Sequence, residues 1–63
     1  MLIKKFREEA GITQMELAKK IGVNQTAISQ WERGSTFPSA SKLPLLASIL
    51  SCTVDDLLRK EDE

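Results

Sequence analysis

The feature that most constrains how this chain can fold is a connection of only three residues, 22–24, between two segments with helical spacing. Gly22 can adopt the left-handed backbone that ends a helix, and Asn24 is a good N-cap for the next helix. The two predicted helices cover residues 14–21 and 25–33. Because so short a connection leaves the helices packed on each other, the sequence predicts a helix-turn-helix.

Further capping residues and breakers delimit the other helices. Thr13 and Glu16 form a Thr-x-x-Glu capping box before residues 14–21, and Gly34 ends the second helix of the pair. Pro44 belongs in a first helical turn, since inside a helix it would cost about 3 kcal/mol. With Gly11 as a stop and Thr53 as a cap, three more helices are expected at residues 2–9, 43–50 and 54–59.

Strand patterns are missing, because no run of β-branched residues alternates with polar ones. The predicted fold class is therefore all-α, a compact five-helix bundle. A chain of 63 residues is one domain at most, which we expect to span residues 1–59. The acidic tail, residues 60–63, is expected to be disordered. The loop 35–42 separates the third and fourth helices.

The composition argues against an enzyme, a metal-binding protein, a disulfide-bonded protein and a membrane protein. The chain has no histidine and only one cysteine, so we expect no disulfide, no metal site, no cofactor and no enzymatic activity. Cys52 lies among apolar residues and is either a buried small hydrophobe or a reactive thiol. No apolar run is long enough to span a membrane and no signal peptide is recognisable, so the expected location is the cytoplasm.

Charge is distributed unevenly although the formal net charge is zero. Residues 1–42 hold seven Lys and Arg against four Glu, whereas residues 43–63 hold two basic residues against five acidic ones. This pattern is compatible with an ordinary solvated surface and a frayed acidic end. It is also compatible with a basic working face and an acidic far side, and charge alone does not distinguish the two.

The helix at residues 25–33 has two chemically different flanks. At about 100° per residue, Ala27, Ile28 and Trp31 share one side, which should pack inward, with Trp31 in the core and not stacked on a base. The opposite stripe carries amides, hydroxyls and a guanidinium: Gln25, Thr26, Ser29, Gln30 and Arg33, with Glu32 at the border. An amide offers a donor beside an acceptor, which matches adenine in the DNA major groove. The stripe alone is equally compatible with a merely solvated helix.

The spacing of apolar positions extends across both helices of the predicted pair. Counted from Gln14, the fourth, eighth, tenth, fifteenth and eighteenth positions are apolar, and small residues occupy the fifth and ninth: Leu17, Ile21, Val23, Ile28, Trp31, Ala18 and Gly22. With "FREEAGITQMELAKKIGV", "TAISQWERG", "FPS" and "LPLLASILSCTVDDLL", the chain resembles the phage repressor and Cro-type helix-turn-helix domain, the XRE family. The resemblance covers about residues 2–58 and implies a lambda-repressor-like DNA-binding domain.

The resemblance also implies roles for individual residues. Gln25, Thr26, Ser29 and Gln30 would contact base edges when residues 25–33 lie in the major groove. Arg7 and Glu32 match a family ion pair, in which Arg7 can also meet a phosphate. The remaining expected phosphate contacts are Gln14, Asn24, Ser35 and Lys42. For the last three of these, a plain cap or a solvated loop is the alternative.

The implied function is sequence-specific binding of double-stranded DNA by a small, non-enzymatic transcriptional repressor. Low net charge predicts modest salt dependence and a need for two subunits, hence a homodimer on a palindromic operator with recognition helices about 34 Å apart. Apolar residues of the last helix are the expected dimer interface: Val54, Leu57 and Leu58. We expect no membrane and no small-molecule ligand. The alternative function is a protein-interaction module or an antitoxin-like helical domain whose main partner is another protein.

Overall fold

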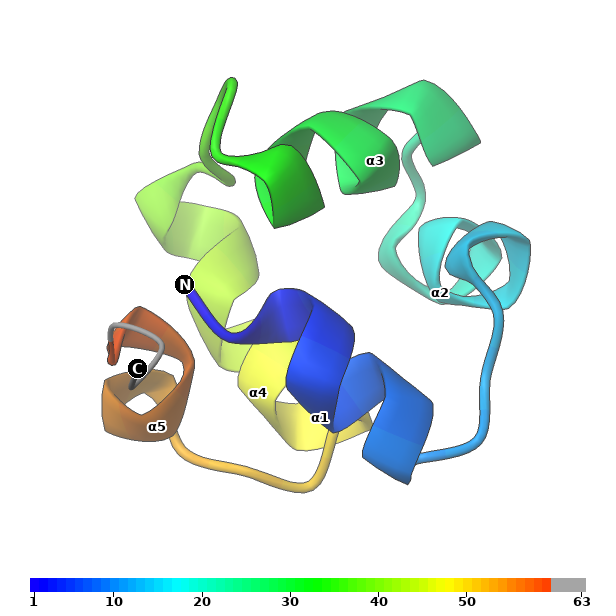
Figure 1. The fold of residues 1–63 in the computed structure, drawn as a ribbon. Helices are drawn as coiled ribbons and strands as arrows, with labels where there is room; N and C mark the ends of the chain where they lie inside the picture. The colour runs from blue at the N-terminus through cyan, green and yellow to red at the C-terminus, as the bar shows by residue number, and fades with distance from the viewer. Residues whose placement is uncertain (60–63) are drawn as a thin grey trace.

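The computed structural model describes residues 1–59, which form five α-helices and one short 3-10 helix, η1 (Figure 1). This confirms the predicted all-α, five-helix fold. The residues of the expected acidic tail, 60–63, lie outside the described range. In chain order the elements are α1 (Ile3–Glu9), α2 (Gln14–Ile21), α3 (Gln25–Arg33), η1 (Ala40–Lys42), α4 (Leu43–Ile49) and α5 (Val54–Leu58).

Capping boxes begin α2 and α5. The Oγ1 of Thr13 accepts the backbone N–H of Glu16 at 3.1 Å, and the carboxylate of Glu16 accepts the N–H of Thr13 at 2.8 Å. Thr53 and Asp56 repeat this arrangement at α5, with distances of 3.0 and 3.2 Å. Each box satisfies two backbone donors that a helix otherwise leaves without a partner, so the chain begins both helices at defined residues.

The turn between α2 and α3 has the geometry that its residues predict. Gly22 has a φ of 90°, and its N–H donates to the carbonyl of Ala18 at 2.8 Å. Asn24 caps α3 by accepting the N–H of Ala27 on Oδ1 at 2.8 Å. At the other end of α3, Gly34 has a φ of 80°. α2 and α3 therefore have the bounds expected from these caps and stops.

The other elements differ from the expectation by a residue or by type. α1 begins one residue later, at Ile3, because Leu2 is the N-cap with a non-helical ψ of 34°; the N–H of Leu2, which a helix start leaves without a partner, donates to the carbonyl of Leu57 at 2.9 Å. α4 ends one residue earlier and is followed by Ser51 at a φ of 57°; α5 also ends one residue earlier. The segment expected to be only loop contains η1, which leads directly into α4.

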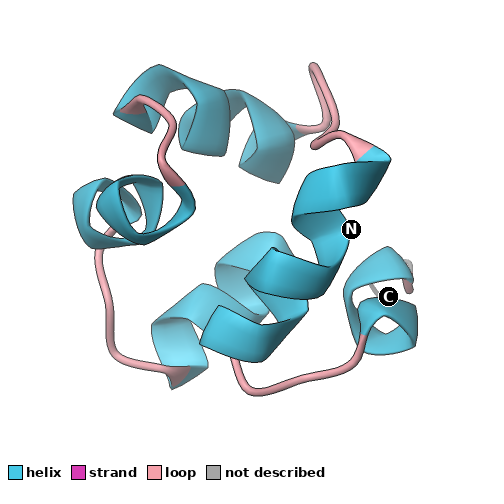
Figure 2. Ribbon diagram, turned by 180° about the vertical axis from the view of Figure 1, so that it is seen from behind, coloured by secondary structure: helices cyan, strands magenta, loops and turns pink. Residues whose placement is uncertain are grey.

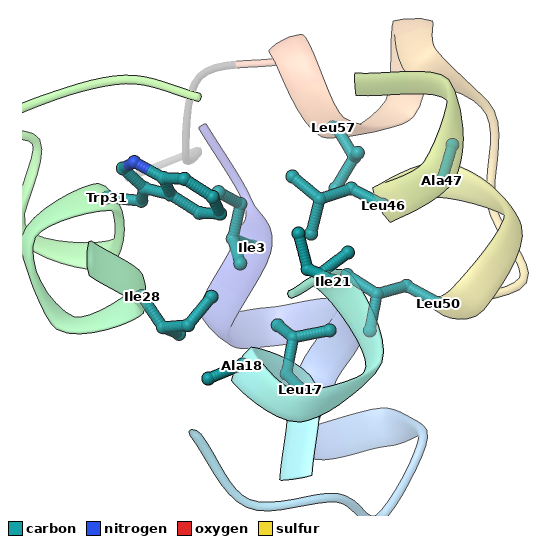
Figure 3. Packing of buried hydrophobic residues seen from close by; sticks show 10 residues of the cluster. All are labelled: Ile3, Leu17, Ala18, Ile21, Ile28, Trp31, Leu46, Ala47, Leu50 and Leu57. Atoms are coloured by element: carbon teal, nitrogen blue, oxygen red, sulfur yellow. The ribbon is translucent and has the colours of Figure 1, made fainter. Parts of the chain in front are cut away.

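The core takes residues from every α-helix, as Figure 3 shows. Ile3, Leu17, Ile28, Leu46 and Leu57 are completely buried. Trp31 is 7% exposed and lies beside Ile3 and Ile28, so its predicted place in the core is confirmed. The buried cluster consists of Ile3, Leu17, Ala18, Ile21, Ile28, Trp31, Leu46, Ala47, Leu50 and Leu57.

Burial of Leu57 corrects one expectation. Its side chain is 0% exposed, so it cannot contact a second subunit of the folded chain, and its assignment to a dimer interface is wrong. The physical reason is that α5 packs the side chain of Leu57 into the core. The carbonyl of Leu57 also accepts a hydrogen bond from the N–H of Leu2, which holds α5 against the start of the chain.

Helices α2 and α3 lie at one side of the molecule and α5 at the other, with α1 and α4 between them (Figures 1 and 2). α3 occupies an edge, and its outer side has no other helix over it in either view. Among residues 1–59, no helix is long and apolar enough to cross a bilayer.

Candidate nucleic-acid interface

The polar stripe of α3 is directed away from the core. Ile28 and Trp31 are buried on the inner flank, whereas Gln25 and Thr26 are exposed. Ser29 and Gln30 are half-buried. The inner flank is anchored by apolar burial, which leaves the amides and hydroxyls free to meet a partner along one side of the helix.

Part of this stripe joins the start of α2 around a shallow, open hollow of about 340 Å³. It is lined by Gln14, Gln25, Thr26, Ser29 and Arg33. Four of these were expected to contact DNA, and the fold brings them together. Gln30 lies outside the hollow, farther round the helix.

Arg33 lines the hollow although sequence reasoning gave it no role in binding. It is exposed near the end of α3 and lies one turn after Ser29 and two turns after Gln25. This i, i+4, i+8 spacing was the available signal, since such residues share a helix face. A guanidinium here brings a positive charge and five N–H donors to the polar face.

The ion pair between Arg7 and Glu32 is present and joins α1 to α3. Arg7 donates from Nε to Oε2 of Glu32 at 2.6 Å and from Nη2 to Oε1 at 3.3 Å. Its Nη1 donates to the carbonyl of Ile12 at 2.9 Å. The hydrogen bond to Glu32 raises the pKa of Arg7 further above its ordinary value. With side chains only 11% and 5% exposed, this pair holds helices together, and the N–H groups that Arg7 has left could still meet a phosphate.

Two further hydrogen bonds extend this pair toward the hollow. Gln14 donates from Nε2 to Oε1 of Glu32 at 2.9 Å. Gln25 then donates from Nε2 to Oε1 of Gln14 at 3.4 Å. The sequence suggested each of these residues separately but not their connection, because Glu32 and Gln14 are 18 positions apart and meet only in the folded chain.

The other expected phosphate contacts, apart from Gln14 and Arg7, do not line the hollow. Asn24 uses Oδ1 for the α3 cap, which leaves its amide N–H₂ as the group that a phosphate would meet. Ser35 is exposed just after α3, and its backbone N–H donates to Gln30. Lys42 is half-buried at the end of η1. The cap at Asn24 is observed; the phosphate contacts of all three remain predictions.

At the far side of the molecule, α5 exposes one apolar residue fully enough to contact a partner. Leu58 is 52% exposed, and Val54 is half-buried against the core. Leu45 on neighbouring α4 is 44% exposed.

Cys52 is half-buried beside the core. Burial and, to a smaller extent, the nearby charge of Asp56 raise the pKa of its thiol. A raised pKa disfavours the thiolate, which supports the small-hydrophobe interpretation over a reactive thiol.

Comparison with known proteins assigns the family. A family model described as Helix-turn-helix matches residues 3–57. The chain belongs to this helix-turn-helix family. Membership confirms the repressor and Cro-type resemblance, and it supports the expectation that the chain is not an enzyme.

Similar helix-turn-helix proteins include characterised regulators. The chain is 35% identical over 60 residues to the HTH-type transcriptional activator BcrR of Enterococcus faecalis, covering 95% of this chain and 29% of that protein. It is 42% identical over 57 residues to repressor protein C2 of Salmonella phage P22, covering 90% and 26%. The chain thus spans less than a third of the length of either relative.

A solved structure shares the helix-turn-helix fold closely. The crystal structure of the P22 c2 repressor in complex with synthetic operator 9T superposes with a TM-score of 0.85 at 41% identity. The match covers 94% of this chain and 89% of that chain.

Proposed function

We propose that this chain binds double-stranded DNA at specific sequences and regulates transcription, with α3 placed in the major groove. The observation that carries this proposal is the outward polar stripe of α3, which shares an open hollow with the start of α2. Close likeness to a repressor that was solved with operator DNA supports the same function. A helix about 10–12 Å across also fits a major groove about 12 Å wide.

Sequence would be read by the exposed side of α3. Gln25 and Gln30 can each offer a donor and an acceptor to the N7 and N6 groups of adenine. Thr26 can contact the methyl group of thymine, and Ser29 can accept or donate a hydrogen bond at a base edge. Gln25 and Thr26 are the most accessible of the four, consistent with their place in the first turn of α3.

Phosphates would fix the position of the domain on the duplex. Gln14 lies at the N-terminus of α2, where unpaired backbone N–H groups and the helix dipole favour an anion. Asn24, Ser35 and Lys42 are further candidates near α3, and Arg7 can contribute the N–H groups that its ion pair leaves. We add Arg33 to this set, because its charge lies at the hollow and at the last residue of α3, whereas base edges are met mainly from the N-terminal part of a recognition helix.

The proposed binding unit is a homodimer on a palindromic operator. One domain offers few cations, so a second copy would supply much of the affinity. With Leu57 removed from the interface, Val54 and Leu58 remain candidates, and exposed Leu45 joins them. The expected cytoplasmic location stays a prediction and fits a protein that acts on DNA.

Selection from a pool of random duplexes tests this function. The wild-type chain should enrich one symmetric motif, and Gln25→Ala and Gln30→Ala should each weaken binding to it by about 1–3 kcal/mol at one position per half-site. Binding to unrelated DNA should change little. Ser48→Ala, on the exposed side of α4, is the control that should select the wild-type motif.

Two results would contradict the proposal. Enrichment of no motif above background would favour the alternative, a module that binds another protein. Unchanged motifs for both glutamine variants would show that another surface reads the DNA.

A further inference from the structure

We infer that Glu32 is a positioning residue that determines which end of two glutamine amides is presented to DNA. This inference rests on the proposed function and concerns how the base-reading side of α3 is set before DNA arrives. The residues involved, Arg7, Glu32, Gln14 and Gln25, form one chain of hydrogen bonds, which we call the amide relay.

Glu32 fixes which residue of the amide relay donates each hydrogen bond and which accepts it. A carboxylate has acceptors only, so every partner must present a donor to it. Arg7 binds both carboxylate oxygens, at 2.6 and 3.3 Å, and Glu32 is 5% exposed. Two bonds from a rigid guanidinium fork hold the carboxylate in one orientation.

Gln14 then has a single suitable orientation. An amide can turn by 180° with almost no change in shape, which exchanges its oxygen and its nitrogen. Because Oε1 of Glu32 cannot donate, Gln14 presents Nε2 to it at 2.9 Å. Its Oε1 consequently faces the start of α3.

The same rule passes to Gln25. The oxygen of Gln14 can only accept, and Gln25 donates to it from Nε2 at 3.4 Å. Gln25 therefore keeps its second N–H and its Oε1 for a partner, with the donor on the side of Gln14 and the acceptor on the other side. If Gln25 were free to turn, it could offer the reverse pattern, or donate to the two acceptors of guanine.

The amide relay thus predicts that base preference at one operator position depends on a residue that does not touch DNA. That position is identified experimentally as the one whose preference Gln25→Ala removes. Four duplexes that differ only there, with A·T, T·A, G·C or C·G, report the preference as ratios of binding constants. Ratios separate reading from general affinity, because losing a phosphate contact weakens all four duplexes equally.

Two variants interrupt the amide relay at different points. Gln14→Met keeps the length of the side chain and the Arg7–Glu32 pair but removes the amide. Glu32→Gln keeps the size but can donate as well as accept, so the direction is lost. For both, we expect the preference at the Gln25 position to fall by at least about fivefold, while the preference at the Gln30 position is kept.

Controls address a merely structural effect. Thr53→Ala lowers stability at α5, far from the amide relay, and should leave all ratios unchanged when the protein is folded. Without DNA, the side-chain N–H₂ signals of Gln25 in ¹⁵N spectra should shift in Gln14→Met and in Glu32→Gln, but not in Thr53→Ala. Gln14→Met retains the buried ion pair, so it tests the idea even if Glu32→Gln folds poorly.

The outcomes are distinct. Wild-type ratios in folded Gln14→Met would overturn the amide relay while leaving the proposed function intact. A wild-type chain that selects no DNA sequence would overturn both. Loss of ratio at the Gln25 position alone, in both variants, supports the amide relay.

Discussion

Apolar burial holds both the α1–α3 region and the α4–α5 region, but in the part of the chain that the structure describes only α1–α3 adds side-chain hydrogen bonds between helices. Among residues 1–59, the side-chain hydrogen bonds that join two helices all lie in α1–α3, where they connect Arg7, Glu32, Gln14 and Gln25. In α4–α5 the side-chain hydrogen bonds are local, as between Thr53 and Asp56, and the packing is apolar. Directional bonds orient the face that would read DNA, whereas non-directional burial is sufficient for the supporting end.

Two ion pairs show the contrast most directly. Arg7 and Glu32 meet at 2.6 Å with side chains 11% and 5% exposed, and they connect residues 25 positions apart. Arg59 and Asp56 approach only to 3.9 Å within one turn, with side chains 73% and 33% exposed. The same chemical types thus make a tertiary tie in one region and a solvated surface pair in the other.

Removing the Arg7–Glu32 ion pair should have the largest effect on the stability of the fold. Glu32→Ala leaves the guanidinium of Arg7 buried without its partner, which should lower the free energy of unfolding by about 3–5 kcal/mol. Urea denaturation at neutral pH measures this. Arg7→Met combined with Glu32→Leu removes both charges and should recover most of the loss. If Glu32→Ala were as stable as wild type, the contrast between the two regions would be wrong.

The apolar end should be broken by removing buried volume. Leu57→Ala leaves a cavity in the core and should cost about 2–5 kcal/mol. Leu58→Ala, its neighbour, is the matched control, because Leu58 is 52% exposed and its truncation should change stability little. Sedimentation of Leu58→Ala should instead show a weaker dimer. Equal destabilisation by the two variants would contradict the different burial of these leucines.

The two capping boxes should stabilise the two regions by similar amounts, because each box depends only on residues three positions apart in the chain. At neutral pH, Thr13→Ala and Thr53→Ala should each cost about 0.5–2 kcal/mol. The backbone N–H and then the hydroxyl of the threonine lower the pKa of Glu16 and of Asp56. Since both pKa values are lower in the folded chain, the stabilisation is complete above the ordinary values of about 4 and is lost as the pH falls through the folded values.

Acid titration separates this effect from others. Wild-type stability should decline below about pH 4, and each threonine variant should show a somewhat smaller decline, because the carboxylate keeps the backbone N–H of that residue but has lost its hydroxyl. A steeper decline in either variant would contradict the capping assignment.

The smallest expected change is in the salt dependence of DNA binding, which compares Arg33 in the α1–α3 region with Arg59 in the α4–α5 region. Arg33→Gln should weaken DNA binding and reduce the slope of log K against log salt by about 0.9 for each bound subunit, as expected for one phosphate contact in each half-site. Arg59→Gln removes the same charge from the residue that follows α5 and should leave the slope unchanged. Binding titrations at four or five salt concentrations measure both slopes. Equal slopes for the two variants would place Arg33 outside the contact surface.

Individual residues show how far prediction from sequence could reach. Thr13, Asn24 and Gly22 act on backbone groups within five residues, so the bounds of α2 and α3 follow from composition and spacing. The prediction that Leu57 lies at a dimer interface was wrong. The adjacent residues Leu57 and Leu58 point to different sides of α5, and only the packing of the helix decides which of them is buried. Arg33 was visible on the polar stripe, but the hollow that gives it a role needs the start of α2 beside it.

The five helices, the tight turn between α2 and α3, and the two flanks of α3 could all be predicted from the amino-acid sequence. These depend on caps, stops and periodicity, which are interactions between near neighbours in the chain. The burial of Leu57 and the position of Glu32 between Arg7 and Gln14 could be known only from the folded chain. Such contacts link positions 18 and 25 residues apart, and their geometry exists only after the apolar core has set the helices side by side.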